Sequence, residues 1–347
     1  MISQKARNIA AYTPGQYLGG GCGFVKLNTN ENPYPPTPLA SVTAGDLASL
    51  RLYSDPYSTE LKTAIAEYHG ITPENVFVGN GSDEVLAIIC QTLFDPGATV
   101  ASLDITYSFY PVYAQMYGFN LKTVPLKKDF TVDVSALAKT ESNGVIFANP
   151  NAPTGTALDL VDIKRILAAD INRPVVVDEA YVDFGAESAD IFLHKYGNLV
   201  VTRTLSKSYS LAGARIGYAL ASKEITAALE RIKNCFNSYT TDSLAQKIAA
   251  LAVRDVSHMK KNAQKIIAAR ERFTGNLKAL GFTVLPSKAN FVFASHNKKS
   301  AKDIFEYLKA RKILVRYFNA PRIDNHLRIT IGTDEDMDKV IGALKNF

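Results

Sequence analysis

Lys207 is the residue of this sequence whose setting most clearly suggests chemistry. It follows an apolar, β-branched run at 199–202 that predicts a buried strand, and it precedes small residues and glycines at 212–217 that allow tight backbone turns. Its neighbours include four hydroxyl side chains and one arginine, namely Thr204, Ser206, Ser208, Ser210 and Arg215. A lysine there suits a Schiff base to an aldehyde cofactor, with the hydroxyls and the guanidinium holding a phosphate on it. The alternative is a solvated lysine in a serine-rich loop.

Asp178 directly follows the apolar run 175–177, which puts a carboxylate at the end of a buried strand. Such a group needs a cationic partner because an isolated buried charge is costly. The ring nitrogen of pyridoxal phosphate is one such partner, and its protonation makes the ring an electron sink. Tyr181 is close enough in sequence to reach the phenolate oxygen of the same ring. The alternative is that Asp178 and Glu179 only cap the following segment.

Two further polar positions suit the same cofactor. Asn151 lies in a turn at 149–155 that is rich in proline, and its amide could donate a hydrogen bond to the phenolate oxygen. Tyr107 follows a predicted strand at 99–103, where its ring could stack on a pyridine ring. An ordinary rigid loop and an ordinary core or surface tyrosine are the alternatives.

A glycine turn at 79–84 joins a predicted strand at 76–78 to a predicted helix at 85–94. Backbone amides at a helix N-terminus bind anions, so the amides of Ser82 and Asp83 are candidates for holding a phosphate. The turn lacks the third glycine of the dinucleotide-binding fingerprint, and a plain strand-to-helix turn is the alternative.

Three arginines, Arg316, Arg322 and Arg328, stand six residues apart near the C-terminal end. Guanidinium groups match carboxylates and phosphates in bidentate geometry, so such a cluster with few nearby acids indicates an anionic ligand. Salt bridges to Asp324 and to the acids at 334–338 are the alternative, but they do not account for all three arginines.

Alternating strands and helices must position these groups. The predicted strands lie at 76–78, 99–103, 121–124, 144–148, 174–177 and 199–202, and the predicted helices at 59–69, 85–94, 107–117 and 158–168. Apolar strands that alternate with helices are typical of an α/β fold with a mainly parallel sheet covered on both faces. Ligands of such a sheet bind beyond the carboxyl ends of its strands, where Ser82, Asn149, Asp178 and Lys207 would meet.

A second, smaller α+β domain is predicted after a long helical region at 225–279, which is broken near 239–242. Its expected elements are strands at 282–285, 291–294 and 327–331 and a helix at 301–311. We therefore divide the chain into an N-terminal arm with part of the small domain at 1–40, a large cofactor-binding domain at 41–235 and a small domain at 236–347.

Composition narrows the class of function. The chain has 347 residues, 47% of them hydrophobic, and a net charge of +6 from lysines and arginines scattered along it, which indicates a solvated surface rather than a nucleic-acid-binding one. Its 3 cysteines and 5 histidines follow no metal or redox spacing, so we expect no metal and a reducing compartment. The longest uncharged apolar run, 85–94, is too short to span a bilayer. These features predict a cytoplasmic protein without nucleic-acid or membrane partners.

Five motifs follow one another in an order that resembles the class I and II pyridoxal-phosphate-dependent aminotransferases of fold type I. They are Asn-Gly-Ser-Asp-Glu at 80–84, Asn-Pro-Asn-Ala-Pro-Thr-Gly at 149–155, Val-Asp-Glu-Ala-Tyr at 177–181, Thr-Leu-Ser-Lys-Ser-Tyr-Ser-Leu-Ala-Gly-Ala-Arg-Ile-Gly at 204–217 and Leu-Arg-Ile-Thr-Ile-Gly-Thr at 327–333. Within this family the sequence resembles the histidinol-phosphate aminotransferases, from residue 27 to residue 333. The resemblance implies a large domain with a mainly parallel, seven-stranded sheet covered by helices, and a smaller α+β domain.

The resemblance also implies a role for each candidate around pyridoxal 5'-phosphate. Lys207 would form the Schiff base and then move a proton between the substrate α-carbon and the cofactor C4′, while Asp178 pairs with the ring nitrogen. Asn151 and Tyr181 would bind the phenolate oxygen, and Tyr107 would stack on the ring. The phosphate would be held by Ser82, Asp83, Thr204, Ser206 and Arg215, with Tyr53 from the neighbouring subunit of a homodimer.

Substrate-binding residues are implied in the same way. Arg328 would bind the substrate α-carboxylate, or face the position that an amino alcohol phosphate lacks. Arg322, with Tyr12 of the arm, would face the distal anion of the substrate, and Asn30 is assigned to the same site. Ile105 and Ala11 stand where the family usually has proline. These departures bear on substrate specificity more than on the chemistry.

The expected reaction is transfer of the amino group of L-histidinol phosphate to 2-oxoglutarate by a ping-pong mechanism. It would give imidazole acetol phosphate and glutamate, in histidine biosynthesis. An aromatic amino acid aminotransferase and a phospho-amino-acid decarboxylase are alternatives that would keep the same cofactor residues. A regulator that retains an aminotransferase-like domain as a ligand sensor, or a basic nucleic-acid binder, is an alternative of another class.

Overall fold

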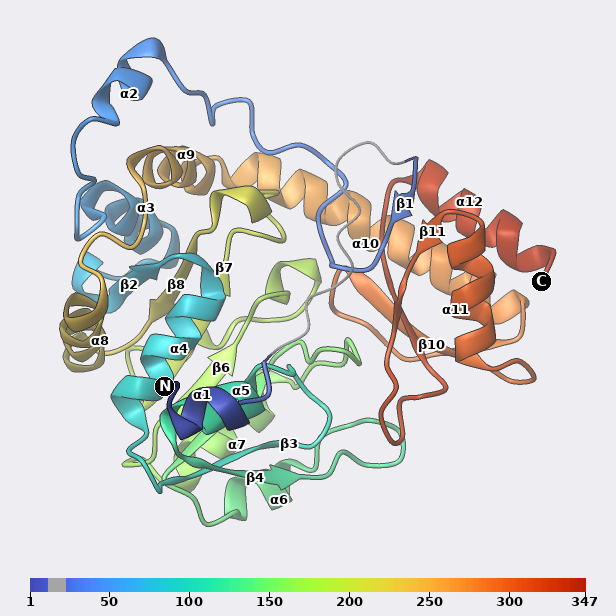
Figure 1. Cartoon of the computed structure of the whole chain (residues 1–347), viewed down its shortest axis with the longest axis horizontal. Coiled ribbons are helices and arrows are strands. Elements are labelled where there is room, and N and C mark those ends of the chain that lie inside the picture. The colour runs from blue at the N-terminus through green and yellow to red at the C-terminus, as the bar shows by residue number, and fades with distance from the viewer. Residues whose placement is uncertain (12–22) are drawn as a thin grey trace.

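The computed structural model of the chain describes residues 1–11 and 23–347, which form two larger sheets with helices packed around them (Figure 1). Tyr12, the predicted substrate-binding residue of the arm, lies outside the described residues. Within these ranges, no helix is long and apolar enough to cross a membrane.

The larger sheet is the one that the alternation of apolar strands and helices predicts. Within the described residues it has seven strands in the order β2-β8-β7-β6-β5-β3-β4. Their bounds are β2 Val76–Gly79, β3 Thr99–Leu103, β4 Asn120–Val124, β5 Gly144–Ala148, β6 Val175–Asp178, β7 Leu199–Thr204 and β8 Gly217–Leu220. All neighbouring pairs are parallel except those of β8, which is antiparallel to both β2 and β7. The prediction of a mainly parallel, seven-stranded sheet is therefore confirmed, although no strand was predicted at the position of β8.

Helices cover both faces of this sheet. Their bounds are α3 Thr59–His69, α4 Gly81–Leu93, α5 Tyr110–Tyr117, α6 Val134–Lys139, α7 Leu160–Ala169, α8 Lys223–Phe236 and α9 Ser243–Arg254. Successive strand residues point to opposite faces. Val176 and Val200 accordingly join the core with α4, α5 and α8, whereas Val175 and Val177 join the core that includes α3, α6, α7 and α9.

One helix has the predicted boundaries and others do not, and in each case a particular residue explains where the helix begins or ends. Thr59–His69 is as predicted, because Gly70 takes the left-handed conformation that ends a helix. The helix expected from 107 begins at Tyr110 instead, with Pro111 in its first turn, where a missing N–H costs nothing. The region 225–279 has a second break at Asp255, whose side chain accepts a hydrogen bond from the His258 N–H and so caps the next helix.

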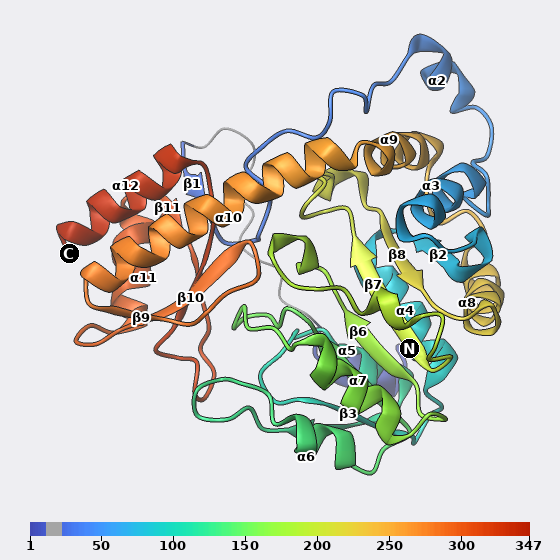
Figure 2. The same cartoon turned by 180° about the vertical axis from the view of Figure 1, so that it is seen from behind.

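The smaller sheet is antiparallel and lies toward the C-terminal end of the chain. In the described part of the chain it has four strands in the order β12-β13-β10-β9. The remaining elements are α1 Gln4–Asn8, β1 Val25–Lys26, α2 Ala44–Ser49, α10 Val256–Ala279, β9 Phe282–Val284, β10 Phe291–His296, α11 Ala301–Ala310, β11 Ile313–Leu314, β12 Arg316–Tyr317, β13 Leu327–Thr330 and α12 Asp334–Lys345. Figure 2 shows α10 running from the side of α9 to the smaller sheet.

Two packing observations bear on the predicted division into domains. Strand β1 pairs with β11 next to the smaller sheet, which agrees with counting the arm as part of the small domain. Helix α9 packs against α3, on the larger sheet. The division at 235–236 stays a prediction, and this packing favours a boundary after Arg254.

Gly217, the first residue of β8, allows the closest approach between the larger sheet and α4. A Cβ at this position would lie on the backbone of Gly81 and Ser82, well inside van der Waals contact. Only a residue without a side chain lets β8 pass the start of this helix.

We therefore expect Gly217→Ala to lower the free energy of unfolding by about 2 kcal/mol, because overpacking must push the backbone apart. Gly213→Ala is the matched control, since an added methyl group there meets nothing within 4 Å. Urea unfolding of both variants measures the difference. Equal stability of the two variants would contradict the steric argument.

Candidate active site

A cavity of about 750 Å³ lies where the carboxyl ends of the parallel strands face the smaller sheet. Asp178 ends β6 and Thr204 ends β7, and both line it. Arg316 and Arg328 line it from the strands β12 and β13. The site thus occupies the edge of the sheet that an α/β fold predicts.

Most of the residues predicted from the sequence meet in this cavity. Those that line it are Asn30, Ser82, Asp83, Tyr107, Asp178, Tyr181, Thr204, Ser206, Lys207, Arg215, Arg322 and Arg328. Asn151 and Tyr53 are not among the lining residues. These residues come from segments between residue 30 and residue 328, and they line one cavity rather than separate loops.

Lys207 follows β7 and reaches into the cavity from a loop that other side chains hold in place. Its Nζ donates a hydrogen bond to the Thr29 carbonyl oxygen at 3.1 Å and lies 5.8 Å from the centre of the Tyr181 ring. The Asn32 amide donates to the carbonyl oxygens of Lys207, at 3.0 Å, and of Ser208, at 3.2 Å. These hydrogen bonds hold the backbone that carries the Lys207 side chain.

Asp178 is 4% exposed and has two hydroxyl partners. Tyr110 donates to its Oδ2 at 3.1 Å, and Thr202 donates to its Oδ1 at 3.2 Å. Burial raises the pKa of the Asp178 carboxyl to about 6, although both hydrogen bonds lower it. The carboxylate is thus costly to ionise without a cation beside it.

Tyr110 and Thr202 are functional residues that reasoning from the sequence missed. Thr202 is the β7 residue paired with Asp178 in the parallel register, so a hydroxyl two residues before the end of the next strand was an available signal. Tyr110 comes from the first turn of α5, and nothing in its local pattern separates it from a core tyrosine.

Tyr107 lies over the same region with its hydroxyl fixed. It donates to Asp83 Oδ1 at 2.6 Å, and its ring meets the Tyr110 ring edge-on, with centroids 5.6 Å apart. The backbone carbonyl of Asp83 accepts a hydrogen bond from Tyr113 at 2.9 Å. These contacts hold the Tyr107 ring at the cavity wall, where a planar ligand could stack on it.

A set of donors suited to a phosphate surrounds the start of α4. Ser82 and Asp83 are in its first turn, and the Arg215 guanidinium lies 3.5 Å from Asp83 Oδ2. Gly81 has a positive φ of 83°, and a Cβ there would collide with the Arg215 guanidinium. Thr204 and Ser206 add hydroxyls from the end of β7. Helix amides, hydroxyls and a guanidinium together form an anion site.

Tyr181 and Asn30 are joined on the opposite wall. The Asn30 amide donates to the Tyr181 hydroxyl at 3.0 Å, and its Oδ1 accepts from Thr330 at 2.9 Å. Asn30 is buried and has a positive φ of 58°, which asparagine tolerates better than most residues.

Two predicted cofactor residues are not among those that line the cavity. The Asn151 amide donates to the Ile105 carbonyl and to Thr154, both at 3.0 Å, and its oxygen accepts from Thr106, so it braces the loop beside Tyr107. Tyr53 is 84% exposed and stacks on Tyr239, with ring centroids 4.6 Å apart. Their roles as ligands of the cofactor stay predictions.

The three C-terminal arginines have different surroundings. Arg322 donates to Asp104 Oδ2 at 2.7 Å and to the carbonyl oxygens of residues 126 and 127 at 2.8 and 2.9 Å, so its guanidinium is directed at loops of the larger sheet. Arg328 donates to the Asn28 carbonyl oxygen at 2.9 Å. Arg316, to which the family resemblance gave no role of its own, lines the cavity beside Phe318.

Comparison with known proteins agrees with this geometry. Residues 23–344 match the family model described as aminotransferase class I and II. A histidinol-phosphate aminotransferase of Clostridium acetobutylicum is 48% identical over 345 residues, which are 99% of this chain and 97% of that protein. One of Acinetobacter baumannii is 47% identical over 348 residues, or 99% and 96% of the two chains. A crystal structure of histidinol-phosphate aminotransferase from Sinorhizobium meliloti, in complex with pyridoxal-5'-phosphate, has a TM-score of 0.85 at 26% identity and covers 99% of this chain and 96% of that one.

The fold and the site are thus those of a pyridoxal-phosphate-dependent enzyme of fold type I. The chain belongs to the class I and II aminotransferases and, within them, to the histidinol-phosphate aminotransferase family.

The cavity residues fit the cofactor of this family. Lys207 offers an amine to an aldehyde, and the Asp178 carboxylate is buried without a cation at hydrogen-bonding distance among the described residues. The donors at the start of α4 match a phosphate, and the Tyr107 ring lines the same cavity. Each chemically distinct part of pyridoxal phosphate therefore has a suitable partner here.

A pH-dependent stability follows from the raised pKa of Asp178. The folded chain holds a proton on this group between the unfolded pKa of about 3.9 and the folded value, so ionisation at higher pH costs stability. We expect the cofactor-free Asp178→Asn variant to be more stable than the wild type by about 3 kcal/mol at pH 7.5 and by about half of that at pH 5.

Urea unfolding of the cofactor-free proteins at the two pH values measures this difference. Asp95→Asn, at an exposed position, should change stability little at either pH. A wild type that is as stable as the Asp178→Asn variant at pH 7.5 would show that Asp178 carries no buried, uncompensated charge.

Proposed function

We propose that this chain transfers the amino group of L-histidinol phosphate to 2-oxoglutarate, giving imidazole acetol phosphate and glutamate, a step of histidine biosynthesis. The observation that carries the proposal is one cavity that combines Lys207, the buried Asp178 and an anion site with two further arginines at its other wall. The identity of nearly half of all residues to proteins named histidinol-phosphate aminotransferase supports the choice of donor.

Each part of the reaction has a residue in this chain. When bound, pyridoxal phosphate supplies an aldehyde that accepts the amino group and a ring that spreads negative charge from the substrate α-carbon. Lys207 Nζ would act as a general base and acid that moves the proton between that carbon and the cofactor C4′. Asp178 would keep the ring nitrogen protonated, because the cation offsets the cost of the buried carboxylate. Tyr181 would donate to the phenolate oxygen, and Tyr107 would orient the ring by stacking.

Anion binding at the far wall is proposed for Arg316 and Arg328 rather than for Arg322. Arg322 directs its donors at Asp104 and at two backbone carbonyls. Arg316 lines the cavity and, among the described residues, has no acidic partner within 4.0 Å. We propose that Arg316 binds the phosphate of the donor and that Arg328 binds the α-carboxylate of 2-oxoglutarate and glutamate. Arg322 would instead hold its own loop, between β12 and β13, against the loops of the larger sheet.

We further propose a cytoplasmic homodimer. Exposed aliphatic side chains gather on and beside α2, which stands away from the rest of the chain in Figure 1: Leu39, Val42, Leu47, Leu50 and Leu52. Such a patch is typical of a protein interface. Tyr53 adjoins it and lies outside the cavity of its own chain, so in a dimer it could reach the phosphate in the partner's site.

The function is tested by absorbance and by steady-state rates. The purified protein should show a band near about 420 nm that is lost in Lys207→Ala. The value of kcat/KM should be higher for L-histidinol phosphate than for phenylalanine or threonine phosphate. A preference for phenylalanine would favour an aromatic amino acid aminotransferase, and carbon dioxide release from threonine phosphate would favour a decarboxylase.

The two arginine roles predict different kinetics. We expect Arg316→Met to lower kcat/KM for L-histidinol phosphate by about 10- to 100-fold, the worth of one or two charge-assisted hydrogen bonds, and to leave unphosphorylated L-histidinol nearly unaffected. Arg322→Met should lower both values by the same factor, because it loosens the cavity wall rather than a contact to phosphate. Loss confined to the phosphorylated donor in Arg322→Met, with none in Arg316→Met, would reverse the assignment.

A further inference from the structure

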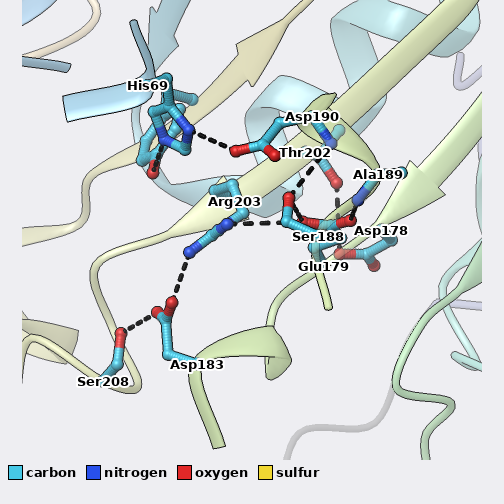
Figure 3. A network of polar contacts seen from close by, with 11 residues as sticks. His69, Asp178, Glu179, Asp183, Ser188, Ala189, Asp190, Thr202, Arg203 and Ser208 are labelled. Atoms are coloured by element: carbon cyan, nitrogen blue, oxygen red, sulfur yellow. Dashed lines mark hydrogen bonds and ion pairs between the residues drawn. The ribbon is translucent and has the colours of Figure 1, made fainter. Parts of the chain in front are cut away.

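Arg203 lies at the centre of a buried polar network (Figure 3). The residue is on β7 and is 4% exposed. Its Nη1 is 3.4 Å from Glu179 Oε2, and its Nη2 is 2.5 Å from Asp183 Oδ1. Neither Arg203 nor these two acids line the cavity, so the network does not touch the substrate. It touches, instead, the segments that carry the two central groups of the site.

One branch of the network fixes Asp178. Glu179 follows Asp178 directly, and its carboxylate also accepts hydrogen bonds from the Ser188 hydroxyl and from the Ala189 N–H, both at 2.6 Å. Thr202 and Arg203 are consecutive on β7, so their side chains point to opposite faces of the sheet. Thr202 binds Asp178 on one face, and Arg203 binds Glu179 on the other. The end of β6 is thus held from both sides.

The other branch fixes the loop of Lys207. Asp183 accepts from Arg203 with one carboxylate oxygen and from the Ser208 hydroxyl with the other. Ser208 follows Lys207, and the Asn32 amide binds the carbonyl oxygens of both residues from the opposite direction. One guanidinium therefore connects the backbone beside Asp178 with the backbone beside Lys207.

The charges of the network do not favour a purely stabilising role. Two carboxylates, Glu179 and Asp183, face one guanidinium, and a third, Asp190, is bound to His69 at 2.6 Å. Burial raises the pKa of Glu179 to about 7, although Arg203 lowers it. A buried ion pair often adds little net stability because desolvation offsets the attraction. What the pair does supply is geometry, since a planar guanidinium can hold two acids at fixed positions.

We propose that Arg203 is a positioning residue that sets the Asp178 carboxylate and the Lys207 amine relative to each other. It acts through Glu179 on the first and through Asp183 and Ser208 on the second. A lysine cannot replace it fully, because a single ammonium lacks the fork that reaches both acids. The inference rests on the proposed function, since it concerns how the two groups that meet the cofactor are held.

The experiment compares two arginines that are about equally buried and lie near opposite ends of β6. Arg203→Met and Arg203→Lys remove or reduce the connection. Arg173→Met is the control, because Arg173 is 6% exposed and binds the carbonyl oxygens of residues 138 and 140 just before the other end of β6. Ser208→Ala is a mild variant that cuts only the Lys207 branch and should cost about 1 kcal/mol of stability.

Three quantities are measured for each protein: the free energy of unfolding without cofactor, the dissociation constant of pyridoxal phosphate, and the pH midpoint of the absorbance of the bound cofactor. Arg203→Met and Arg173→Met should both lose stability. Only Arg203→Met should bind the cofactor at least about 10-fold more weakly and raise the midpoint by about 0.5 pH unit or more, because loss of the buried guanidinium cation favours the protonated, cationic form of the Lys207–cofactor link. Arg203→Lys should restore part of both changes, and Ser208→Ala should raise the midpoint alone.

The possible outcomes separate the two proposals. A wild-type protein that fails to bind pyridoxal phosphate would overturn the proposed function. A wild type that binds it, together with an Arg203→Lys variant and a Ser208→Ala variant that keep the wild-type affinity and midpoint, would overturn the positioning role. An Arg173→Met variant that changes affinity and midpoint as much as Arg203→Met does would overturn that role as well. If Arg203→Met does not fold, the Lys and Ala variants decide.

Discussion

The cost of burying the Asp178 carboxylate is the constraint on which the site depends. A charge at the end of a covered strand is stable only if hydroxyls and a cation reach it. Two hydroxyls, those of Tyr110 and Thr202, are supplied by the protein, and the pKa of about 6 shows that they do not suffice. The remaining stabilisation needs a cation, which is the part that the proposed function gives to the ring nitrogen of the cofactor.

The topology of the larger sheet explains why one cavity can serve the whole cofactor. Parallel strands bring their carboxyl ends to one edge, where Asp178 and the Lys207 loop are neighbours. The antiparallel strand β8 lies next to β7 and, through Gly217, against the start of α4. The carboxylate, the amine and the anion site therefore stand side by side across three adjacent strands and one helix terminus. In the proposed function, cofactor groups that lie far apart in the ring system would be bound by elements that are adjacent in the sheet.

Sequence patterns predicted the features that depend on neighbouring residues along the chain. They missed contacts that depend on how distant elements pack against one another. The strands, the mainly parallel sheet and the positions of Asp178 and Lys207 follow from apolar runs and their polar ends. Tyr110 reaches Asp178 only through the placement of its helix, which no local pattern contains. Thr202 reaches it through strand register, and the only sign of this in the sequence is a hydroxyl near the end of the next strand. The regular spacing of three arginines indicated an anionic ligand, yet Arg322 meets Asp104, more than two hundred residues away in sequence. No strand was predicted at the position of β8, because its first residue, Gly217, closes the stretch at 212–217 for which tight turns were predicted.

The short strand β1 gives the cavity a mechanical connection to the smaller sheet. It pairs with β11 at Val25 and Lys26, and the chain continues within three residues to Thr29, whose carbonyl oxygen accepts the hydrogen bond of Lys207. Asn32, in the same segment, donates a hydrogen bond to the Lys207 carbonyl oxygen. A shift of the smaller sheet toward or away from the larger one is consequently transmitted along eight residues of backbone, Val25 to Asn32, to the reactive amine. A change in the width of the cavity would therefore also change the hydrogen bonding of Lys207.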